Sequence, residues 1–235
     1  STSHQKPDEF RKAIQVLDKR VDGLIVMAPQ LDAGGTASIL KTETPVVLLN
    51  TYTEGLSADV FNFDNFAGSK AVTEHLLGLG HRRIALSHGP QLSRDAQERA
   101  RGYRDAMGAA GIADTSALEF QGGYTREAGY ATAQEIAAAD PRPTAIVAAN
   151  DYSAMGAMSA LRDLGISVPD EMAVTGFDGL PSGQYTVPPL TTVRVPIGEI
   201  GRRAVTRLAA RLRGDDDGEP HQKHFVPVEL VVRQS

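Results

Sequence analysis

Short, wholly apolar segments alternate with amphipathic ones along this chain, and this alternation constrains the fold more than any other feature. The apolar segments are 24–28, 46–49, 84–86 and 145–147. Strands that are apolar on both faces belong to parallel sheets covered by helices on both sides. Amphipathic helices are indicated by apolar residues at helical spacing, for example Ile197, Ile200, Ala204, Leu208 and Leu212. The alternation predicts an open α/β fold, and the last segment, 224–232, reads as an edge strand because it carries Pro227.

Length and composition exclude several classes of protein. The chain has 235 residues, which is long for one core and comfortable for two smaller lobes. A formal net charge of −5 argues against a broad nucleic-acid-binding surface on this segment. The absence of cysteine excludes disulfides and thiolate sites. No apolar run approaches the roughly 18 residues that a membrane span requires, so no membrane contact is expected.

Polar and aromatic side chains follow nearly every predicted strand. Ligands of open parallel sheets bind beyond the carboxyl ends of the strands, so these side chains are candidate ligand contacts. They are Asp64-Asn65, the loop 89–95 that leads to Arg99, Gly122-Gly123-Tyr124, Asn150-Asp151 and Phe177-Asp178-Gly179. Carboxylates accept hydrogen bonds, an amide donates and accepts, Arg donates in a planar fork, and Tyr packs on an apolar face. The mixture suits a polyhydroxylated or otherwise polar small molecule.

Each of these residues also has a structural interpretation that the sequence leaves open. Helix N-capping is the commonest role for Asp and Asn at such positions. It applies to Asp64, Asn65, Asn150 and Asp151. Asp178-Gly179 also fits a simple turn, and Tyr124 fits a loop anchor. Arg99 lies near Glu98 and Arg101 on a predicted helix and fits a solvated or ion-paired side chain.

Catalytic signatures are absent from the sequence. His75, His81 and His88 do not have metal-ligand spacing, and Ser87-His88 are too close in sequence for a nucleophile–base pair. No nucleophile-elbow, phosphate-loop or dinucleotide-binding motif occurs. We therefore expect neither an enzyme, nor a metal site, nor a cofactor.

Five segments, taken in order, resemble the lactose/galactose repressor (LacI/GalR) family of regulators. They are HLLGLGHRRIA at 75–85, RARGY at 99–103, AND at 149–151, VTGFD at 174–178 and PPLTTV at 188–193. Each is weak alone, but the ordered set is specific, and the resemblance extends over residues 9–233.

The resemblance implies two doubly wound parallel-sheet lobes joined by three crossovers, as in periplasmic binding proteins. The crossovers are expected near residues 76, 195 and 224. The N-terminal lobe would be 1–76 with 196–223, and the C-terminal lobe 77–195 with 224–235. Ser1-Thr2-Ser3 resembles the loop after that lobe's second strand, so we expect the first strands to be missing and the natural protein to continue upstream.

The resemblance also implies a function. The ligand would lie in the cleft between lobes, against Asp64, Arg99, Tyr124, Asn150 and Asp178, with Asp151 serving mainly the helix cap and the structure around it. The chain would form a homodimer, partly through 179–190, and ligand binding would change the lobe hinge and the spacing of upstream helix-turn-helix headpieces that bind operator DNA.

We therefore predict the sugar- or metabolite-sensing domain of a cytoplasmic transcriptional regulator. A solute-binding protein of a sugar transporter is the alternative, since it would share the fold and the pocket. Two departures from the family pattern leave the ligand open: Val195 stands where many members have a polar residue, and the chain has no Trp.

Overall fold

The chain folds into two compact units. The computed structural model describes residues 7–18, 20–27, 42, 44–52, 58–215 and 220–235. Unit 1 comprises 1–63 and 196–227, and unit 2 comprises 64–195 and 228–235. The chain passes from one unit to the other three times, as the resemblance implies. The interpretation of Ser1–Ser3 as a loop lies outside the described residues.

Two of the three division points differ from the expected crossovers. The first was expected near residue 76, which falls inside helix α3 (Asn65–Gly78). That helix packs along α4 (Arg94–Ala109) so closely that a Cβ at Gly102 would lie 2.2 Å from the Phe66 carbonyl oxygen. All of α3 therefore belongs to unit 2, and the division comes after Phe63.

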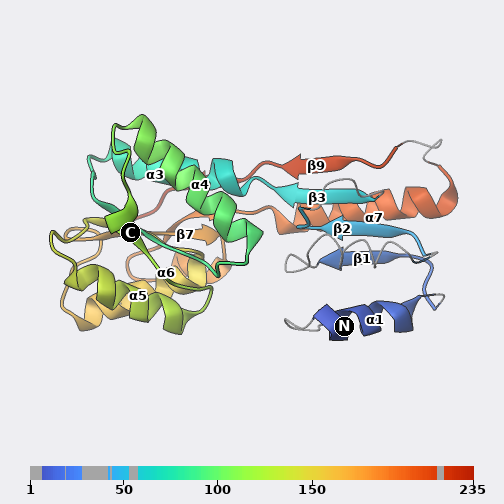
Figure 1. Ribbon diagram of the computed structural model, residues 1–235, viewed down its shortest axis with the longest axis horizontal. Helices are drawn as coiled ribbons and strands as arrows, with labels where there is room; N and C mark the ends of the chain where they lie inside the picture. Colours follow the sequence, from blue (N-terminus) through green and yellow to red (C-terminus); the bar gives the residue numbers. More distant parts are fainter. Residues whose placement is uncertain (1–6, 19, 28–41, 43, 53–57, 216–219) are drawn as a thin grey trace. The chain divides into compact units, whose positions relative to one another are not determined.

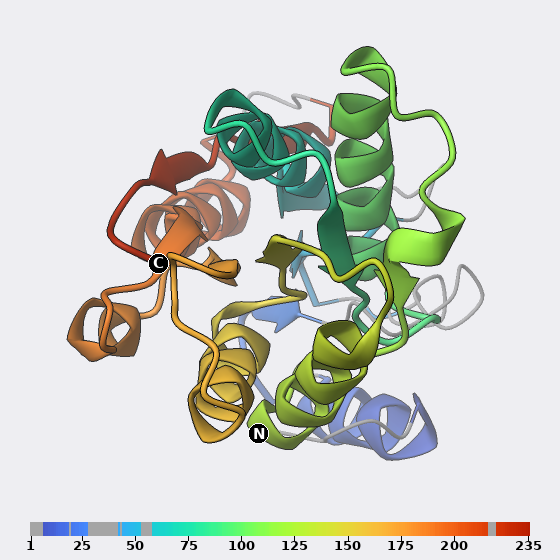
Figure 2. The same cartoon turned by 90° about the vertical axis from the view of Figure 1, so that its left-hand side faces the viewer.

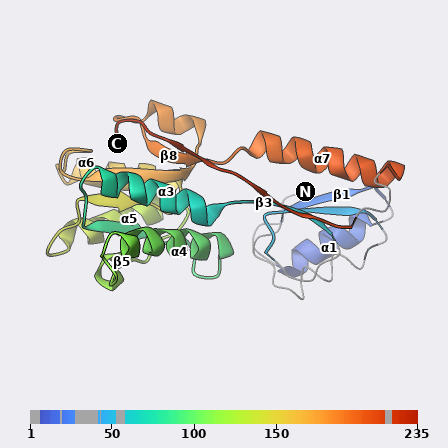
Figure 3. The same cartoon turned by 90° about the horizontal axis from the view of Figure 1, so that it is seen from above.

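In its described residues, unit 1 is a four-stranded parallel sheet between two helices. The strands follow the order β1-β2-β3-β9 and are β1 (Leu24–Met27), β2 (Val46–Leu49), β3 (Asp59–Phe63) and β9 (Lys223–Val226). Helices α1 (Pro7–Leu17) and α7 (Ile197–Arg213) lie on opposite faces of this sheet (Figure 3). Ile14 of α1 packs into a core cluster with Leu24, Leu48 and Val60.

Unit 2 is a six-stranded sheet, parallel except for one edge strand. Its order is β10-β8-β7-β6-β4-β5, with β10 antiparallel to β8. The strands are β4 (Ile84–Ser87), β5 (Glu119–Phe120), β6 (Ala145–Val147), β7 (Ala173–Asp178), β8 (Thr191–Arg194) and β10 (Glu229–Val231). Besides α3 and α4, the unit contains η1 (Ser116–Leu118), α5 (Arg126–Ala138), α6 (Asp151–Asp163) and η2 (Pro181–Tyr185). Helices α3 and α4 cover one face of the sheet, and α5 and α6 cover the other (Figures 1 and 2).

The last predicted strand is divided between the two units. Instead of one strand over 224–232, β9 pairs with β3 in unit 1 and β10 pairs with β8 in unit 2. Pro227 stands between them, where its missing N–H costs neither sheet a hydrogen bond. The third crossover therefore follows Pro227 rather than residue 224.

Among the helices that the structure describes, none combines the length and the apolar character needed to cross a bilayer.

Candidate ligand-binding site

Three neighbouring parallel strands of unit 2 end at the same edge of its sheet. Strand β4 ends at Ser87, β6 at Val147 and β7 at Asp178. Helices α4 and α6 begin shortly after β4 and β6, so their N-termini also lie at this edge. We call the carboxyl ends of these three strands, with the residues that follow them, the strand-exit edge. It is the position at which open parallel sheets bind ligands.

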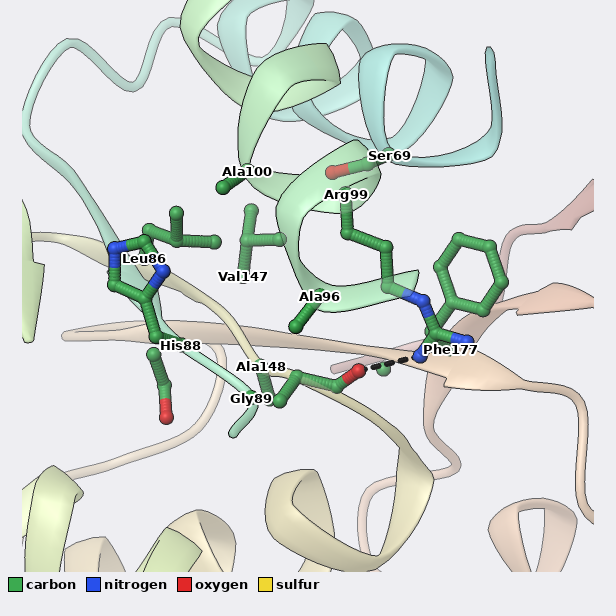
Figure 4. Close-up of a pocket in the computed structure, with 13 residues that line it drawn as sticks. Ser69, Leu86, His88, Gly89, Ala96, Arg99, Ala100, Val147, Ala148 and Phe177 are labelled. Atoms are coloured by element: carbon green, nitrogen blue, oxygen red, sulfur yellow. Dashed lines mark hydrogen bonds between the residues drawn. The ribbon is translucent and has the colours of Figure 1, made fainter. Parts of the chain in front are cut away.

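Arg99 of α4 joins three other elements at the strand-exit edge. Its side chain is buried, with Nε donating to Asn65 Oδ1 at 2.7 Å and Nη1 donating to the Ala149 carbonyl at 2.6 Å. The second of these bonds is the dashed line in Figure 4. The guanidinium carbon lies 3.7 Å from the centroid of the Phe177 ring, and Figure 4 shows the two groups side by side. The interpretation of Arg99 as a solvated side chain is wrong because Arg99 is buried, and the interpretation as an ion-paired one is confirmed, with Asp178 as the partner. Glu98 pairs with Arg94 and Arg101 instead.

Asp178 is the anion opposite Arg99. Its Oδ1 lies 3.3 Å from Arg99 Nη2, and 33% of its side chain remains exposed. Burial raises the pKa of Asp178 above its ordinary value, and the Arg99 charge opposes that rise. The backbone φ of Asp178 is 110°, a conformation that residues other than glycine rarely adopt and that is concentrated at functional sites. Asp178 is thus more than the solvated turn that the sequence left open.

Asn150 caps α6, as one of its two interpretations predicts. Its Oδ1 accepts from the Ser153 N–H at 2.9 Å, and the Ser153 hydroxyl accepts from the Asn150 N–H, which completes a capping box. Its Nδ2 donates to the Tyr124 carbonyl at 3.2 Å. The Asp151 side chain takes no part in the cap, contrary to expectation, but it serves the structure around the cap, as expected. The Asp151 carboxylate accepts from the Thr192 hydroxyl and the Leu180 N–H instead.

Tyr124 lies beside Arg99 and anchors the loop that precedes α4. Its hydroxyl is 2.9 Å from the hydroxyl of Ser93, the N-cap of α4, and burial raises its pKa. The Arg99 guanidinium carbon is 5.8 Å from the centroid of its ring. A Cβ at Gly89 would lie 2.7 Å from the ring, so the loop packs directly on it. The loop-anchor interpretation is confirmed, and a ring contact with a ligand stays a prediction.

Asp64 is not among the residues that contact Arg99 directly. Its carboxylate caps α3 by accepting from the Ala67 N–H at 2.8 Å. The next residue, Asn65, contacts Arg99 and donates through Nδ2 to Asp95 Oδ1 at 2.9 Å. Asn65 and Asp95 are among the strand-exit candidates of the sequence, but neither is in the ligand set that the resemblance implies. Asp95 and Arg99 are four apart on one helix, a spacing that places both on one face and that could have identified Asp95.

The cavity beside Arg99 is too small for a metabolite. It measures about 10 Å³, which is room for one water molecule. Its lining includes the apolar side chains of Leu86, Ala96, Val147 and Phe177. The accessible part of the strand-exit edge is therefore its exposed surface, where 33% of the Asp178 side chain is open to solvent.

The site has no catalytic arrangement. In the part of the chain that the structure describes, no three His, Asp or Glu residues are grouped as metal ligands. His88 is hydrogen-bonded to Glu119 at 2.8 Å, and the buried Ser87 hydroxyl has no hydrogen-bond partner, so the two do not form a nucleophile–base pair. The donors and acceptors of the strand-exit edge suit binding rather than bond cleavage.

Comparisons with known proteins identify the family of this chain. Residues 73–235 match the family described as periplasmic binding protein-like domain. The HTH-type transcriptional repressor PurR of Histophilus somni (strain 129Pt) is 30% identical over 236 residues, which are 99% of this chain and 70% of that protein.

Two solved structures extend the likeness to the fold. A complex of the transcriptional regulator CelR with cellobiose has a TM-score of 0.86 at 28% identity, covering 99% of this chain and 71% of that one. A dimeric Lac repressor has a TM-score of 0.88 at 28% identity, covering 99% and 84%. These relatives are transcriptional regulators and not enzymes. The chain therefore belongs to the LacI family of transcriptional regulators, as an effector-binding domain of the periplasmic-binding-protein type.

Proposed function

We propose that this domain senses a small polar metabolite, most simply a sugar, which binds at the strand-exit edge through Arg99, Asn150, Asp178 and Tyr124. One observation carries the proposal: a buried guanidinium holds a partly exposed carboxylate in a strained backbone conformation at the carboxyl end of a parallel strand. Strain of this kind persists only where the surrounding structure over-determines it, and it is typical of binding sites.

The chemistry of the edge favours a ligand with hydroxyl groups. The Asp178 carboxylate accepts hydrogen bonds, and the Asn150 amide and the Tyr124 hydroxyl can both donate and accept. The partly buried Tyr124 ring supplies apolar surface beside them, whereas the Phe177 ring is buried against Arg99. The cellobiose complex of CelR supports a sugar, whereas the likeness to PurR keeps the ligand class open. Val195 is buried, and its N–H donates to the Asp178 carbonyl, so it adds no polar side chain to the edge.

The proposed output is a change in DNA binding. The relative from H. somni is a helix-turn-helix repressor, and we place operator binding in an upstream headpiece because this segment carries a net charge of −5. Effector binding would shift the hinge between lobes and the geometry of a homodimer in the cytoplasm. The relatives are regulators, and they therefore favour this function over the solute-binding protein of a transporter.

A surface of unit 2 supports the homodimer. Tyr185 and Val187, in and after η2, are 78% and 94% exposed. They lie beside a groove of about 790 Å³ whose lining includes Met155 and Met158 of α6. Large exposed apolar side chains beside a groove are typical of interaction surfaces. The dimeric Lac repressor supports a second copy of this chain as the partner.

A thermal-shift screen tests the proposed function. The panel comprises ribose, cellobiose, ribose 5-phosphate and adenine, each with wild type, Arg99→Ala and Arg94→Ala. A compound at about a hundred times its Kd adds roughly 2.7 kcal/mol to the folded state and raises the melting temperature. We expect one compound to stabilise wild type and Arg94→Ala but not Arg99→Ala. Arg94 is the matched control because it lies on the same helix with its side chain exposed. Equal stabilisation of all three proteins would contradict the proposed site.

A further inference from the structure

The turn after β7 needs a group that holds it in place. Asp178 and Gly179 have φ values of 110° and 72°. Glycine adopts such values freely, but Asp178 does not, so surrounding contacts have to fix it. Asp178 is also the residue that the proposed site offers to its ligand. Any group that fixes this turn therefore fixes the site.

The carboxylate of Asp151 makes the contacts that fix the turn. Asp151 has no exposed surface. Its Oδ2 accepts from the N–H of Leu180 at 2.6 Å, and its Oδ1 accepts from the hydroxyl of Thr192 at 2.5 Å. Leu180 follows Gly179 directly, and Thr192 lies in the neighbouring strand β8. One carboxylate thus ties the turn to the adjacent strand.

Gly176 leaves the space that this carboxylate occupies. A Cβ at position 176 would lie 2.3 Å from Asp151 Oδ1, closer than any real contact permits. Gly176 is also the residue paired with Thr192 in the register of β7 and β8. The carboxylate therefore lies beside a register pair of β7 and β8. Gly176 leaves space for it because it has no side chain, and Thr192 donates a hydrogen bond to it.

The surroundings of Asp151 make its charge costly to the fold. Burial raises the pKa of Asp151 to about 6, although the hydrogen bonds from Thr192 and Leu180 oppose the rise. The charge of Asp178 raises this pKa further, and Arg233 lowers it. Because the folded pKa is raised, the cost to folding is complete above about pH 6, shrinks as the pH falls from there, and is absent below the ordinary value of 3.8. At neutral pH the ionised carboxylate of Asp151 therefore holds the turn in position but lowers the free energy of unfolding.

Asp151 also follows Asn150, the other strand-exit residue of α6 proposed to bind the ligand. Asn150 is the N-cap of α6, and Asp151 is its first residue. Asn150 is thus one proposed ligand contact, and the next residue, Asp151, holds the turn that carries another, Asp178.

We propose that Asp151 is a positioning residue of the effector site, whose carboxylate, through Leu180 and Thr192, keeps Asp178 facing Arg99. Its effect on effector affinity rests on the proposed function, whereas its effect on the position of Asp178 does not.

Crystal structures of three variants test the positioning. Asp151→Ala removes both acceptors, and we expect Asp178 Oδ1 to leave hydrogen-bonding distance of Arg99. Asp151→Asn keeps an acceptor for Leu180 and should restore the position of Asp178. Asp163→Asn is the matched control, because it changes an exposed carboxylate on the same helix. An unchanged Asp178 in Asp151→Ala would overturn the proposal.

Calorimetry with the four compounds of the panel measures the consequence for binding. For a compound that wild type binds, Asp151→Ala should lose ten- to a hundredfold in affinity while its melting temperature changes by only a few degrees. Asp151→Asn should recover the affinity. A lower melting temperature with unchanged affinity would assign Asp151 a structural role only and overturn the proposal. If wild type binds none of the four, the proposed function fails for this panel, and the crystal structures still decide the positioning.

An NMR titration of Asp178→Asn keeps the proposal falsifiable if Asp151→Ala does not fold. The backbone amides of Leu180 and residue 178 should titrate together with one shared midpoint, since both respond to Asp151 when residue 178 can no longer ionise. That midpoint should lie below the pKa of Asp151 in wild type, because the Asp178 charge that raises this pKa is gone. A residue 178 amide that does not follow that of Leu180 would overturn the proposal.

Discussion

Arg99 and Asp178, which are 79 residues apart in the sequence, meet at 3.3 Å between Nη2 and Oδ1. Arg99 is also bonded to Asn65 and to the Ala149 carbonyl, so its removal leaves several buried groups without a partner. Asp178 is partly exposed and makes fewer contacts. Asp178 is therefore the cleaner residue with which to separate ligand binding from stability.

Asp178→Asn should weaken effector binding with little effect on folding. A charge-assisted hydrogen bond is worth about 1.5–3 kcal/mol, and losing one corresponds to a ten- to hundredfold loss of affinity. Asn also tolerates positive φ better than most residues, so the turn should persist. Calorimetry with a compound that binds wild type measures the first effect, and a urea titration measures the second. A large loss of stability with wild-type affinity would reverse our assignment.

Two variants of Tyr124 separate its ring from its hydroxyl. Tyr124→Phe loses the hydrogen bond to Ser93, whose net worth is about 1 kcal/mol. Tyr124→Ala also loses the ring that packs on Gly89 and lies beside Arg99. We expect the Ala variant to bind the effector at least tenfold more weakly than the Phe variant. Equal affinities in calorimetry would show that the ring does not contact the ligand.

Glu119 should make the stability of unit 2 sensitive to acid. Burial alone would raise its pKa, but hydrogen bonds from Arg104, Thr115 and His88 outweigh burial and lower the pKa to about 2. A lowered folded pKa means that the contribution is complete above the unfolded value and is lost as the pH falls through the folded one. That contribution is roughly 3 kcal/mol, lost between about pH 5 and pH 2.

Urea titrations of wild type and Glu119→Gln at several pH values measure this contribution. We expect the difference in unfolding free energy to be largest near neutral pH and to shrink towards pH 2. A difference that is constant with pH would mean that the ionised carboxylate is not the stabilising form.

Val187→Glu should weaken the proposed homodimer. The side chain is 94% exposed beside the groove along α6, where a charge would oppose burial against a second copy. Sedimentation velocity should show a dimer for wild type and a shift towards monomer for the variant. Leu92→Glu is the control, since Leu92 is equally exposed but lies in the loop before α4. Dissociation by Leu92→Glu alone would place the interface elsewhere.

The alternation of apolar and amphipathic segments was sufficient to predict the α/β class, but not the end points of the lobes. Helix α3 starts immediately after the first crossover, and it belongs to unit 2 because Gly102 lets α4 approach it. A packing contact between segments over thirty residues apart leaves no local signal. The same holds for β9 and β10, which read as one strand until their pairing partners are known.

The candidate site could be predicted to the level of strand exits but not of individual side chains. Arg99, Asn150 and Asp178 were selected because they follow predicted parallel strands, whose carboxyl ends meet at one edge of a sheet. The sequence position could not tell which of Asp64 and Asn65 contacts Arg99, since consecutive residues at the start of a helix point in different directions. Nor could it show that Asp151 contacts Thr192 rather than the cap, because that contact spans 41 positions in the sequence.

A crystal structure of this domain with the panel compound that most raises its melting temperature tests the central claim most directly. We predict that the compound lies at the strand-exit edge, with its polar atoms within hydrogen-bonding distance of Arg99 or Asp178 and of Asn150. A compound bound elsewhere, with the Arg99–Asp178 pair untouched, would contradict the account.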